Sequence, residues 1–260
     1  MDRLSAVIIT LNEEGKIGSC IDSLWNVADE IIVLDSFSTD RTVAIAKEKG
    51  AIVKQEKFAG YIEQKNRALQ LATHNYILSL DADETLSAAL ISSVLREKDG
   101  FKFKAYSMNR YNHYCGHFIK HGLWYPDRKV RLFDKRIAAW GGLNPHDKIQ
   151  LRQDIEPHLL HGNILHFTFD TIEDHSKRNE RMSSIAATSI MEAGIKKPWW
   201  KIVLSPAWSF LHGYFLRLGF LDGFHGYIIA RQTARLSFLK YQKLQRLQKE
   251  NKRSLVTVFN

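Results

Sequence analysis

Short apolar runs that alternate with helix-like stretches fill the first hundred residues and most constrain the fold. Four apolar runs are expected to form strands: Ser5–Thr10, Glu30–Leu34, Ala51–Lys54 and Tyr76–Leu80. Helical periodicity follows each of them, over Glu14–Trp25, from Thr39 or Asp40 to Lys49, over Tyr61–Ala72 and over Ser87–Glu97. Strands that are apolar almost throughout are typical of a parallel sheet covered by helices on both faces. The sequence therefore predicts an α/β fold with a mostly parallel, Rossmann-like sheet.

The pattern changes in the second half of the chain. Strands are expected at Phe103–Arg110 and Lys129–Phe133 with an aromatic, His-rich loop between them, and Gly141–Pro145 is expected to be a turn or loop. A polar helix is expected over Thr171–Gly194, and Lys196-Lys197-Pro198 marks a boundary. We therefore predict a first domain over residues 1–195 and a helical segment over residues 196–260.

Polar residues directly after the strands indicate where a ligand would bind. In an open parallel sheet, ligands sit outside the carboxyl ends of the strands. Here those ends are followed by Thr10-Leu11-Asn12-Glu13, by Asp35-Ser36 and by Asp81-Ala82-Asp83. A dinucleotide dehydrogenase needs a glycine-rich first turn, but this first turn is TLNEE and the first glycine of the chain is Gly15. With no GxGxxG motif and no P-loop, the sequence argues against that class of enzyme.

Asp81 and Asp83 form an acidic pair after the apolar run YILSL. Side chains at positions i and i+2 of a strand point to the same side, so we expect the two carboxylates to lie together, with Glu84 supporting them. Such oxygen ligands suit Mg²⁺ or Mn²⁺ and leave positions open for diphosphate oxygens. A solvated acidic strand end is the alternative, but the place of the pair in a βαβ series favours the metal site.

Four motifs occur in order and resemble family 2 glycosyltransferases of the GT-A fold: VIITLNEE, EIIVLDSFSTDRT, QKNRALQLA and YILSLDADE. Four later segments are similar to the lipopolysaccharide-core β-glucosyltransferase branch, whose members act on heptose: WYPDRKVRLFDK, WGGLNPHDKI, HFTF and LGFLDGFHGYIIA. The resemblance covers nearly the whole chain. It implies an inverting, metal-dependent hexosyltransferase with a GT-A catalytic domain over residues 1–195.

The resemblance also implies roles for the polar residues of the first half. Asp35 is expected to hydrogen-bond the base, usually uracil, because a carboxylate accepts from the ring N–H. A turn role for Asp35 and a solvated helix face for Lys65 are the alternatives. The full set expected at the nucleotide, with Asn66 beside Lys65, is Thr10, Asn12, Glu13, Asp35, Lys65 and Asp81.

Inversion requires a base that takes the proton of the acceptor hydroxyl. The family places this base in a loop after the metal motif, commonly as His-Glu, and this chain has His146-Asp147. We expect Asp147 to be the base, although the shorter aspartate departs from the family pattern. The alternative for Asp147 is a salt bridge to a nearby Lys or Arg, with Asp134 and Asp127 as fallback bases.

Residues of the later motifs complete the expected site. His166 is expected to join Asp81 and Asp83 at the metal or to touch the diphosphate, with a structural histidine as the alternative. Acceptor-binding side chains are expected at Trp124, Tyr125, Arg131 and His146. The planar fork of Arg131 suits an acceptor or a phosphate, and the aromatic side chains suit stacking against sugar rings. The H-x-C-x-H spacing near residue 115 is not that of a usual structural zinc site.

The positive charge of the chain is concentrated near its C-terminus. The net charge is +9, and residues 196–260 hold twelve Lys or Arg against two acids, a net +10, together with three of the six tryptophans. An aromatic, basic, amphipathic segment is typical of a helix in the bilayer interface, attracted to anionic lipid. Packing on the first domain and oligomer formation are the alternatives, while the apolar density argues against nucleic acid. The longest uncharged run, Ile202–Leu216, is shorter than the roughly 20 residues of a spanning helix.

Cysteine usage and the N-terminus indicate the compartment. With only two cysteines there is no disulfide framework, and the first apolar run is too short for a secretory signal. We therefore expect a cytoplasmic protein on the inner face of the inner membrane that transfers a sugar, glucose in the first instance, from a UDP-sugar to a lipopolysaccharide-core or other lipid-linked glycan. The alternative is a catalytically inactive membrane-bound module that binds a sugar nucleotide.

Overall fold

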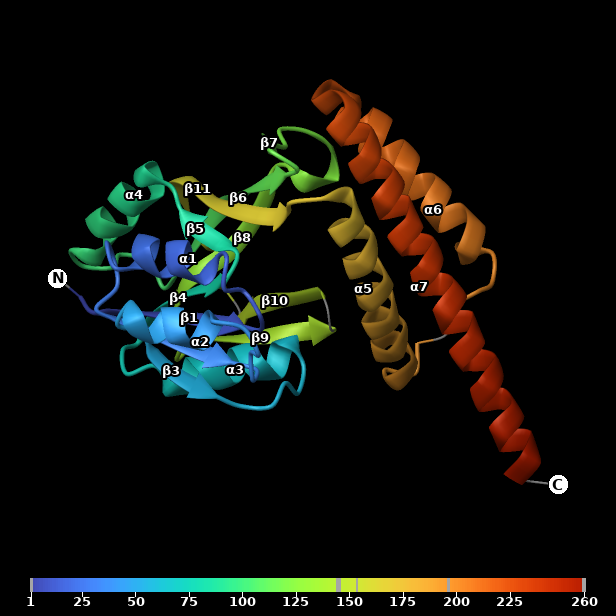
Figure 1. Cartoon of the computed structure of the whole chain (residues 1–260), viewed down its shortest axis with the longest axis horizontal. Coiled ribbons are helices and arrows are strands. Elements are labelled where there is room, and N and C mark those ends of the chain that lie inside the picture. Colours follow the sequence, from blue (N-terminus) through green and yellow to red (C-terminus); the bar gives the residue numbers. More distant parts are fainter. Residues whose placement is uncertain (1, 144–145, 153, 196, 259–260) are drawn as a thin grey trace. The chain divides into compact units, whose positions relative to one another are not determined.

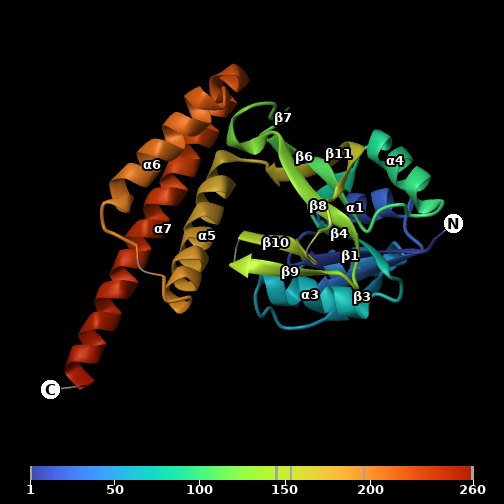
Figure 2. The same ribbon diagram turned by 180° about the vertical axis from the view of Figure 1, so that it is seen from behind.

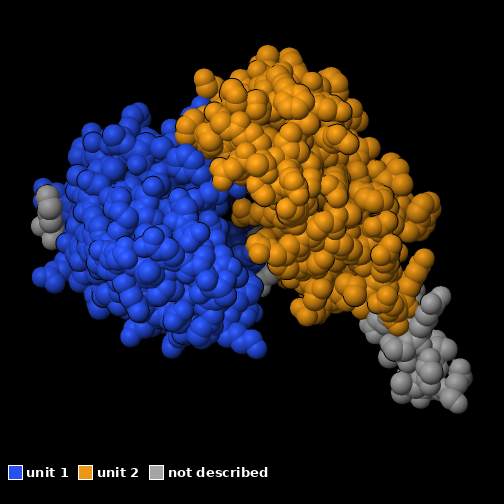
Figure 3. All heavy atoms as spheres, in the orientation of Figure 1, with its two compact units in different colours: residues 1–112, 127–142, 147–168 blue, residues 113–126, 143–146, 169–260 orange. Residues whose placement is uncertain are grey.

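The structure is a computed structural model that describes residues 2–143, 146–152, 154–195 and 197–258 (Figure 1). The chain divides into two compact units (Figure 3). Unit 1 comprises residues 1–112, 127–142 and 147–168, and unit 2 comprises residues 113–126, 143–146 and 169–260. The boundary predicted near residue 196 falls inside unit 2, between two of its helices.

Unit 1 is built around a mixed sheet. Its strands are β1 (Leu4–Thr10), β2 (Glu30–Asp35), β3 (Ile52–Gln55), β4 (Tyr76–Asp81), β5 (Glu84–Leu86), β6 (Ala105–Tyr114), β8 (Asp127–Asp134) and β11 (His158–Phe169). The order is β3-β2-β1-β4-β8-β6-β11-β5, and β9 (Ala138–Leu143) and β10 (His146–Leu151) form a separate pair. Strands β3, β2, β1 and β4 are parallel, and β8 joins β4 antiparallel. The α/β architecture with parallel strands predicted from the sequence is confirmed, with antiparallel strands added beyond β4.

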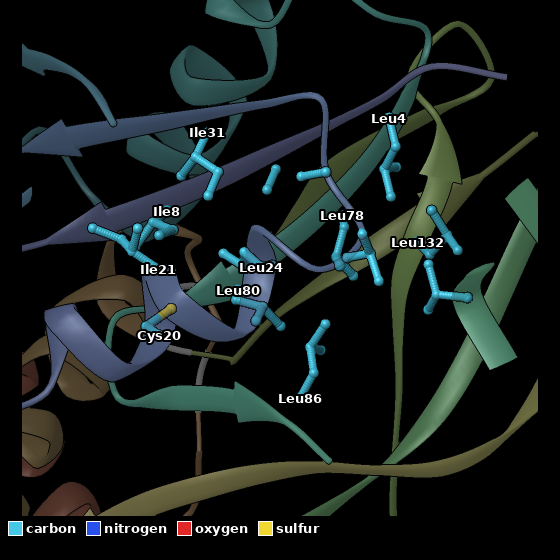
Figure 4. Close-up of a cluster of buried hydrophobic side chains, with 14 of the residues drawn as sticks. Leu4, Ile8, Cys20, Ile21, Leu24, Ile31, Leu78, Leu80, Leu86 and Leu132 are labelled. Atoms are coloured by element: carbon cyan, nitrogen blue, oxygen red, sulfur yellow. The ribbon is translucent and has the colours of Figure 1, made fainter. Parts of the chain in front are cut away.

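Both faces of the parallel strands are buried, which explains why those strands are apolar almost throughout. On one face, α1 (Ile17–Leu24) and α4 (Ala88–Lys98) cover a cluster that includes Leu4, Ile8 and Leu78 (Figure 4). On the other face lie α3 (Tyr61–Leu71) and β9 (Figures 1 and 2). Helix α2 (Thr42–Glu48) joins β2 to β3. Burying each of these large aliphatic side chains stabilises the fold by about 1.5–3 kcal/mol.

Unit 2 is mostly helical. It contains β7 (His117–Phe118), η1 (Gly122–Trp124), α5 (Ile172–Glu192), α6 (Lys201–Leu211), η2 (His212–Leu216), η3 (Gly219–Asp222) and α7 (Gly223–Val258). Helices α5 and α6 both pack along α7. Glycines allow η3 to lie close to the first turn of α7, because a Cβ on Gly226 would lie 1.8 Å from the carbonyl oxygen of Gly219. Within the described part of the chain, no helix combines the length and apolar character that crossing a bilayer requires.

Most predicted elements agree with the structure to within a few residues, and one prediction is wrong. Residues 141–143, expected to be a loop, belong to β9. The glycines there disfavour a strand by propensity, but pairing with β10 overrides that preference. Residues 144 and 145 of the same expected loop lie outside the described residues.

Candidate active site

Three of the predicted site residues end neighbouring parallel strands. Thr10 of β1 is in register with Asp35 of β2, and Ile9 is in register with Asp81 of β4. Thr10, Asp35 and Asp81 therefore lie at one edge of the sheet, the edge at which parallel α/β sheets bind ligands. Thr10 is buried, and its hydroxyl oxygen has no hydrogen-bond partner among the described residues.

The loops after β1 and β2 are tied together by side-chain hydrogen bonds. Asn12 has a φ of +55°, a left-handed conformation that Asn tolerates, and its Oδ1 accepts from the backbone N–H of Thr39 at 2.8 Å. Asp35 is fully buried, and its Oδ2 accepts from the N–H of Ser38 and from Nε2 of Gln55, both at 2.9 Å. The backbone N–H of Glu13 donates to Thr42. The predicted nucleotide residues thus fix the two loops, and in this arrangement Asp35 performs the turn role given as its alternative.

Lys65 joins two of the predicted site carboxylates. Its Nζ lies 3.0 Å from Oδ1 of Asp81 and 2.8 Å from Oδ2 of Asp147, although Lys65 and Asp147 are 82 positions apart in the chain. The Lys65 side chain is only 6% exposed, so the alternative of a solvated helix face is wrong. The salt bridge that the sequence left open for Asp147 is present in the structure.

Trp140 of β9 packs against this ammonium group. Nζ of Lys65 lies 4.3 Å from the centroid of the Trp140 ring, a cation–π contact. Asn66 fixes the ring because its side chain pairs with both the N–H and the carbonyl of Trp140, each at 2.9 Å. Asn66 therefore positions β9 on α3.

Arg131 and Arg110 neutralise the acids behind Asp81. One terminal nitrogen of Arg131 donates to Oδ2 of Asp81 at 3.0 Å and to Oε1 of Glu84 at 2.9 Å. Arg110 reaches the same Glu84 oxygen and also pairs with Asp127. Burial alone would raise the pKa of Asp81, but the charges of Lys65 and Arg131 outweigh it and hold that pKa well below 3.8. Asp81 is therefore a permanent anion at neutral pH.

Asp83 and His166 form a second polar pair. Nε2 of His166 lies 3.2 Å from Oδ2 of Asp83, and Nδ1 lies 2.6 Å from Oδ1 of Asn112. A histidine whose Nδ1–H is held by a carbonyl presents Nε2 as a ligand, which is the usual arrangement at a metal site. Among the described residues, no three Asp, Glu, His or Cys side chains converge on one point. The carboxylate of Asp83 and the imidazole of His166 would suit an ion whose shell is completed by other oxygens, as that of Mg²⁺ or Mn²⁺ is at phosphates.

The geometry between Asp81 and Asp83 differs from the prediction. Strand β4 ends at Asp81, and Ala82 and Asp83 form a turn. Carboxylates at positions i and i+2 share a side only where the backbone is extended through both positions, and the turn at position 83 breaks that condition. Asp81 contacts Lys65 and Arg131, and Asp83 contacts His166.

Cys20 lies next to the carboxylates, in surroundings that favour the neutral thiol. Its Sγ is buried, 3.7 Å from the backbone oxygen of Asp81. Burial raises the pKa of the thiol well above 9.0, and the charges of Glu84, Asp83 and Asp81 raise it further. Metal binding and nucleophilic attack both require the thiolate, which this environment disfavours.

The remaining predicted residues have contacts of their own. Trp124 and Tyr125 belong to unit 2, where the Trp124 ring packs against Tyr114 with a centroid distance of 5.5 Å. The side chain of His146 lies outside the described residues. Of the fallback bases, Asp134 pairs with Tyr76 at the start of β4, the opposite edge of the sheet, so that prediction is wrong. Asp127 is held by Arg110 and Lys129.

Sequence reasoning missed three residues that shape this site: Arg110, Asn112 and Trp140. Two of them come from the middle of β6, where alternating side chains of a strand gave no local motif. Trp140 lies in the quoted segment WGGLNPHDKI, but only the fold brings its ring to Lys65.

Several known proteins are similar to this chain in sequence or structure. Residues 5–168 match the family model described as glycosyl transferase family 2. An uncharacterized glycosyltransferase of Rickettsia typhi is 32% identical over 95% of this chain and 88% of its own length. A lipopolysaccharide core biosynthesis glycosyltransferase of Rhizobium meliloti is 29% identical over 93% of this chain and 91% of its own. A crystal structure of glucosyl-3-phosphoglycerate synthase from Mycobacterium tuberculosis, with Mn²⁺, uridine diphosphate and phosphoglyceric acid, gives a TM-score of 0.36 at 26% identity, over 43% of this chain and 44% of that one.

Proposed function

The chain belongs to glycosyl transferase family 2, and from this premise we propose that it transfers a sugar from a UDP-sugar to a hydroxyl group of a lipid-linked glycan, with inversion. One observation supports this best. Lys65 joins Asp81, at the edge where the donor diphosphate would bind, to Asp147, the candidate base. Donor and acceptor chemistry thereby meet at one buried cation.

Asp147 acts as the base in this proposal. The acceptor hydroxyl gives its proton to the Asp147 carboxylate while its oxygen bonds to the anomeric carbon, on the side opposite the diphosphate. The bond from that carbon to the diphosphate oxygen breaks, and UDP departs with the electron pair. The product therefore has the inverted configuration at the anomeric carbon.

Lys65 has two successive roles in this scheme. In the absence of a donor, the ammonium group of Lys65 lies 2.8 Å from Asp147 and occupies its carboxylate. A diphosphate has more negative charge than one carboxylate, so a bound donor competes for Lys65 and releases Asp147. The base then becomes effective only when a donor is present, and this order limits proton abstraction in its absence.

Asp83 and His166 are the side chains that would hold Mg²⁺ or Mn²⁺. When bound, such an ion supplies positive charge for the leaving diphosphate. Asn112 keeps Nε2 of His166 directed at Asp83. Asp81, predicted to share the ion, would first have to exchange its contact with Lys65 or Arg131 for it.

The acceptor class and the location are also part of the proposal. The relative from Rhizobium meliloti acts in lipopolysaccharide core biosynthesis by its name, which supports a core-type acceptor. The basic, apolar surface of unit 2 supports peripheral association with the anionic cytoplasmic face of the inner membrane. Trp124, Tyr125, Arg131 and His146 remain the proposed acceptor contacts, and Thr10, Asn12, Glu13 and Asp35 the proposed nucleotide contacts.

A screen of nucleotide sugars tests the proposal. The purified chain is incubated with each sugar nucleotide and Mn²⁺ or Mg²⁺, and donor hydrolysis and transfer to core glycolipid are measured. Asp83→Ala is expected to abolish the metal-dependent turnover, whereas Asp22→Ala, at a carboxylate that is 60% exposed, leaves it unchanged. Binding of UDP without turnover of any donor would favour the inactive binding module. A chain that takes up neither the ion nor a uridine compound would refute both.

A further inference from the structure

Helix α6 has an unusual surface for a helix of its composition. Seven of its eleven residues are Ile, Val, Leu, Ala, Trp or Phe, yet none of them is buried in the described structure. Val203 is 63% exposed and Trp208 is 60% exposed, and Leu216 in the following η2 is 64% exposed. A contiguous apolar surface of this kind marks a site that another apolar phase covers.

Helix α6 runs beside α7 (Figures 1 and 2), and side chains of both helices line a groove. Its volume is about 330 Å³, and it is lined by Trp200, Leu204, Ser205, Trp208 and Ser209 of the α6 side and by Ser237, Lys240 and Tyr241 of α7. The α6 residues recur at helical spacing, so one face of α6 forms one wall. The groove thus combines two indole rings, four hydroxyl groups (three of serine and one of tyrosine) and the ammonium group of Lys240.

Two lysines define the charge of this groove. Nζ of Lys240 lies 4.8 Å from the Tyr241 ring centroid, and Nζ of Lys201 lies 5.6 Å from the ring of Trp200 and 5.9 Å from that of Tyr241. Neither lysine forms a salt bridge with a carboxylate of the described residues, in contrast to Lys243 and Arg235 of α7, which both pair with Glu180. One ammonium group in the groove, that of Lys240, and a second against its aromatic lining, that of Lys201, therefore have no carboxylate partner among the described residues.

We propose that the groove between α6 and α7 binds the phosphate headgroup of an anionic phospholipid, with the acyl chains against the exposed apolar side chains of α6 and η2. Lys201 and Lys240 contact the phosphate, and the serine hydroxyls donate to its oxygens. Trp200 and Trp208 lie at the boundary between headgroup and chain, where indole rings are favoured. The inference rests on the proposed membrane association and adds a defined lipid site to it.

Charge complementarity selects this occupant. A second copy of the chain would bring the same excess of positive charge, twelve basic residues against two acids over residues 196–260. A free glycan would use the indole rings and hydroxyls but would leave both ammonium groups without a counter-ion. An anionic lipid satisfies the rings, the hydroxyls, the ammonium groups and the exposed aliphatic surface together.

Flotation of the full chain with vesicles tests the site. Vesicles of phosphatidylglycerol are expected to bind the chain and phosphatidylcholine vesicles are not. The double variant K201Q/K240Q is expected to lower the partition coefficient roughly thirtyfold, since each lysine near an anionic surface contributes about 1 kcal/mol. The charge-matched control R231Q/K249Q, also in unit 2, is expected to lower the partition coefficient by less than about fivefold. A charge more than about 8 Å from the bound phosphate is largely screened from it.

Two further measurements distinguish a defined lipid site from general charge attraction and from glycan binding. Phosphatidylglycerol with brominated acyl chains is expected to quench tryptophan fluorescence, and quenching is expected to fall in Trp208→Phe. Equal losses in the two double variants, equal binding to both lipids, or saturable binding of lipid-free core oligosaccharide that K201Q/K240Q abolishes would each overturn the proposal. Binding of UDP by K201Q/K240Q, measured by calorimetry, is expected to match the parent chain. If the chain binds UDP but does not bind vesicles, the lipid site is refuted and the transferase proposal is unaffected.

Discussion

Replacing Lys65 by methionine removes the cation that joins Asp81 and Asp147. The aliphatic part of the side chain remains against Trp140, so the change is mainly one of charge. Removing one partner of a buried ion pair costs about 3–5 kcal/mol. Because Asp81 is 27% exposed and Asp147 is 12% exposed, water partly compensates them, and we expect a loss of about 3 kcal/mol in the free energy of unfolding. For a chain of this size that corresponds to a fall of roughly 6–12 °C in Tm.

The pH dependence of this loss tests its cause. The pKa of Asp81 is lowered in the folded protein, so its stabilising contribution is present above the unfolded pKa and is lost as pH falls through the folded pKa. Without Lys65 the pKa of Asp81 moves back towards its ordinary value, and Arg131 and Arg110 are the cations that still lower it. The difference between parent and Lys65→Met is therefore expected to be full at neutral pH and to shrink below about pH 4.

Urea unfolding followed by circular dichroism at pH 7 and pH 3.5 measures both quantities. Lys49→Met is the matched control, because Lys49 lies 2.6 Å from Asp22 but the two side chains are 33% and 60% exposed. An exposed pair contributes less than about 1 kcal/mol, so this control is expected to change little. A deficit in Lys65→Met that stays the same at pH 3.5 would show that lost packing, not lost charge, is responsible, and would refute the reasoning.

Three further predictions follow from the same contacts. Asp147→Asn is expected to lower transfer by about 10²–10⁴-fold with UDP affinity unchanged by calorimetry, and a variant that transfers normally would remove Asp147 as the base. Asn112→Ala is expected to lower the affinity for Mn²⁺ at His166 by about 10–100-fold, measured by titrating Mn²⁺ into the UDP-binding assay. An unchanged Mn²⁺ titration would place the ion elsewhere. Leu78→Ala, at a fully buried side chain, is expected to cost about 2–5 kcal/mol in urea unfolding, whereas Leu11→Ala, at a side chain that is 43% exposed, should cost far less.

Local pattern was sufficient to predict the parallel half of the fold. Buried strands such as β1 and β4 are apolar because both sheet faces are covered, and turn residues interrupt them at regular intervals. The helix predicted over Ser87–Glu97 begins one residue later because the Ser87 hydroxyl accepts from the N–H of Leu90 and caps it. In each case the residues that interact are close in sequence, so a local sequence pattern predicts the element.

The antiparallel half was less predictable because its contacts are distant in sequence. Strand β5 has three residues and pairs with β11. Glu84 of β5 lies opposite His166 of β11. Neither strand has a complete pattern of its own, and the 3-residue length gives no period to detect. The loop expected at residues 141–143 was wrong for the same reason, since pairing with β10 places them in a strand although Gly142 has a φ of +110°.

The site itself combines both situations. The positions of Thr10, Asp35 and Asp81 follow from strand register alone, because parallel neighbours bring their carboxyl ends to one edge. The charge of Asp81 does not follow from register, because it depends on cations that are distant in sequence. Lys65 of α3 and Arg131 of β8 both pair with Asp81 and keep it ionised. A motif therefore locates an acid, whereas the basicity of that acid is a property of the fold. For the same reason the sequence offered a salt bridge for Asp147 but could not identify Lys65, 82 positions away, as the cation that forms it.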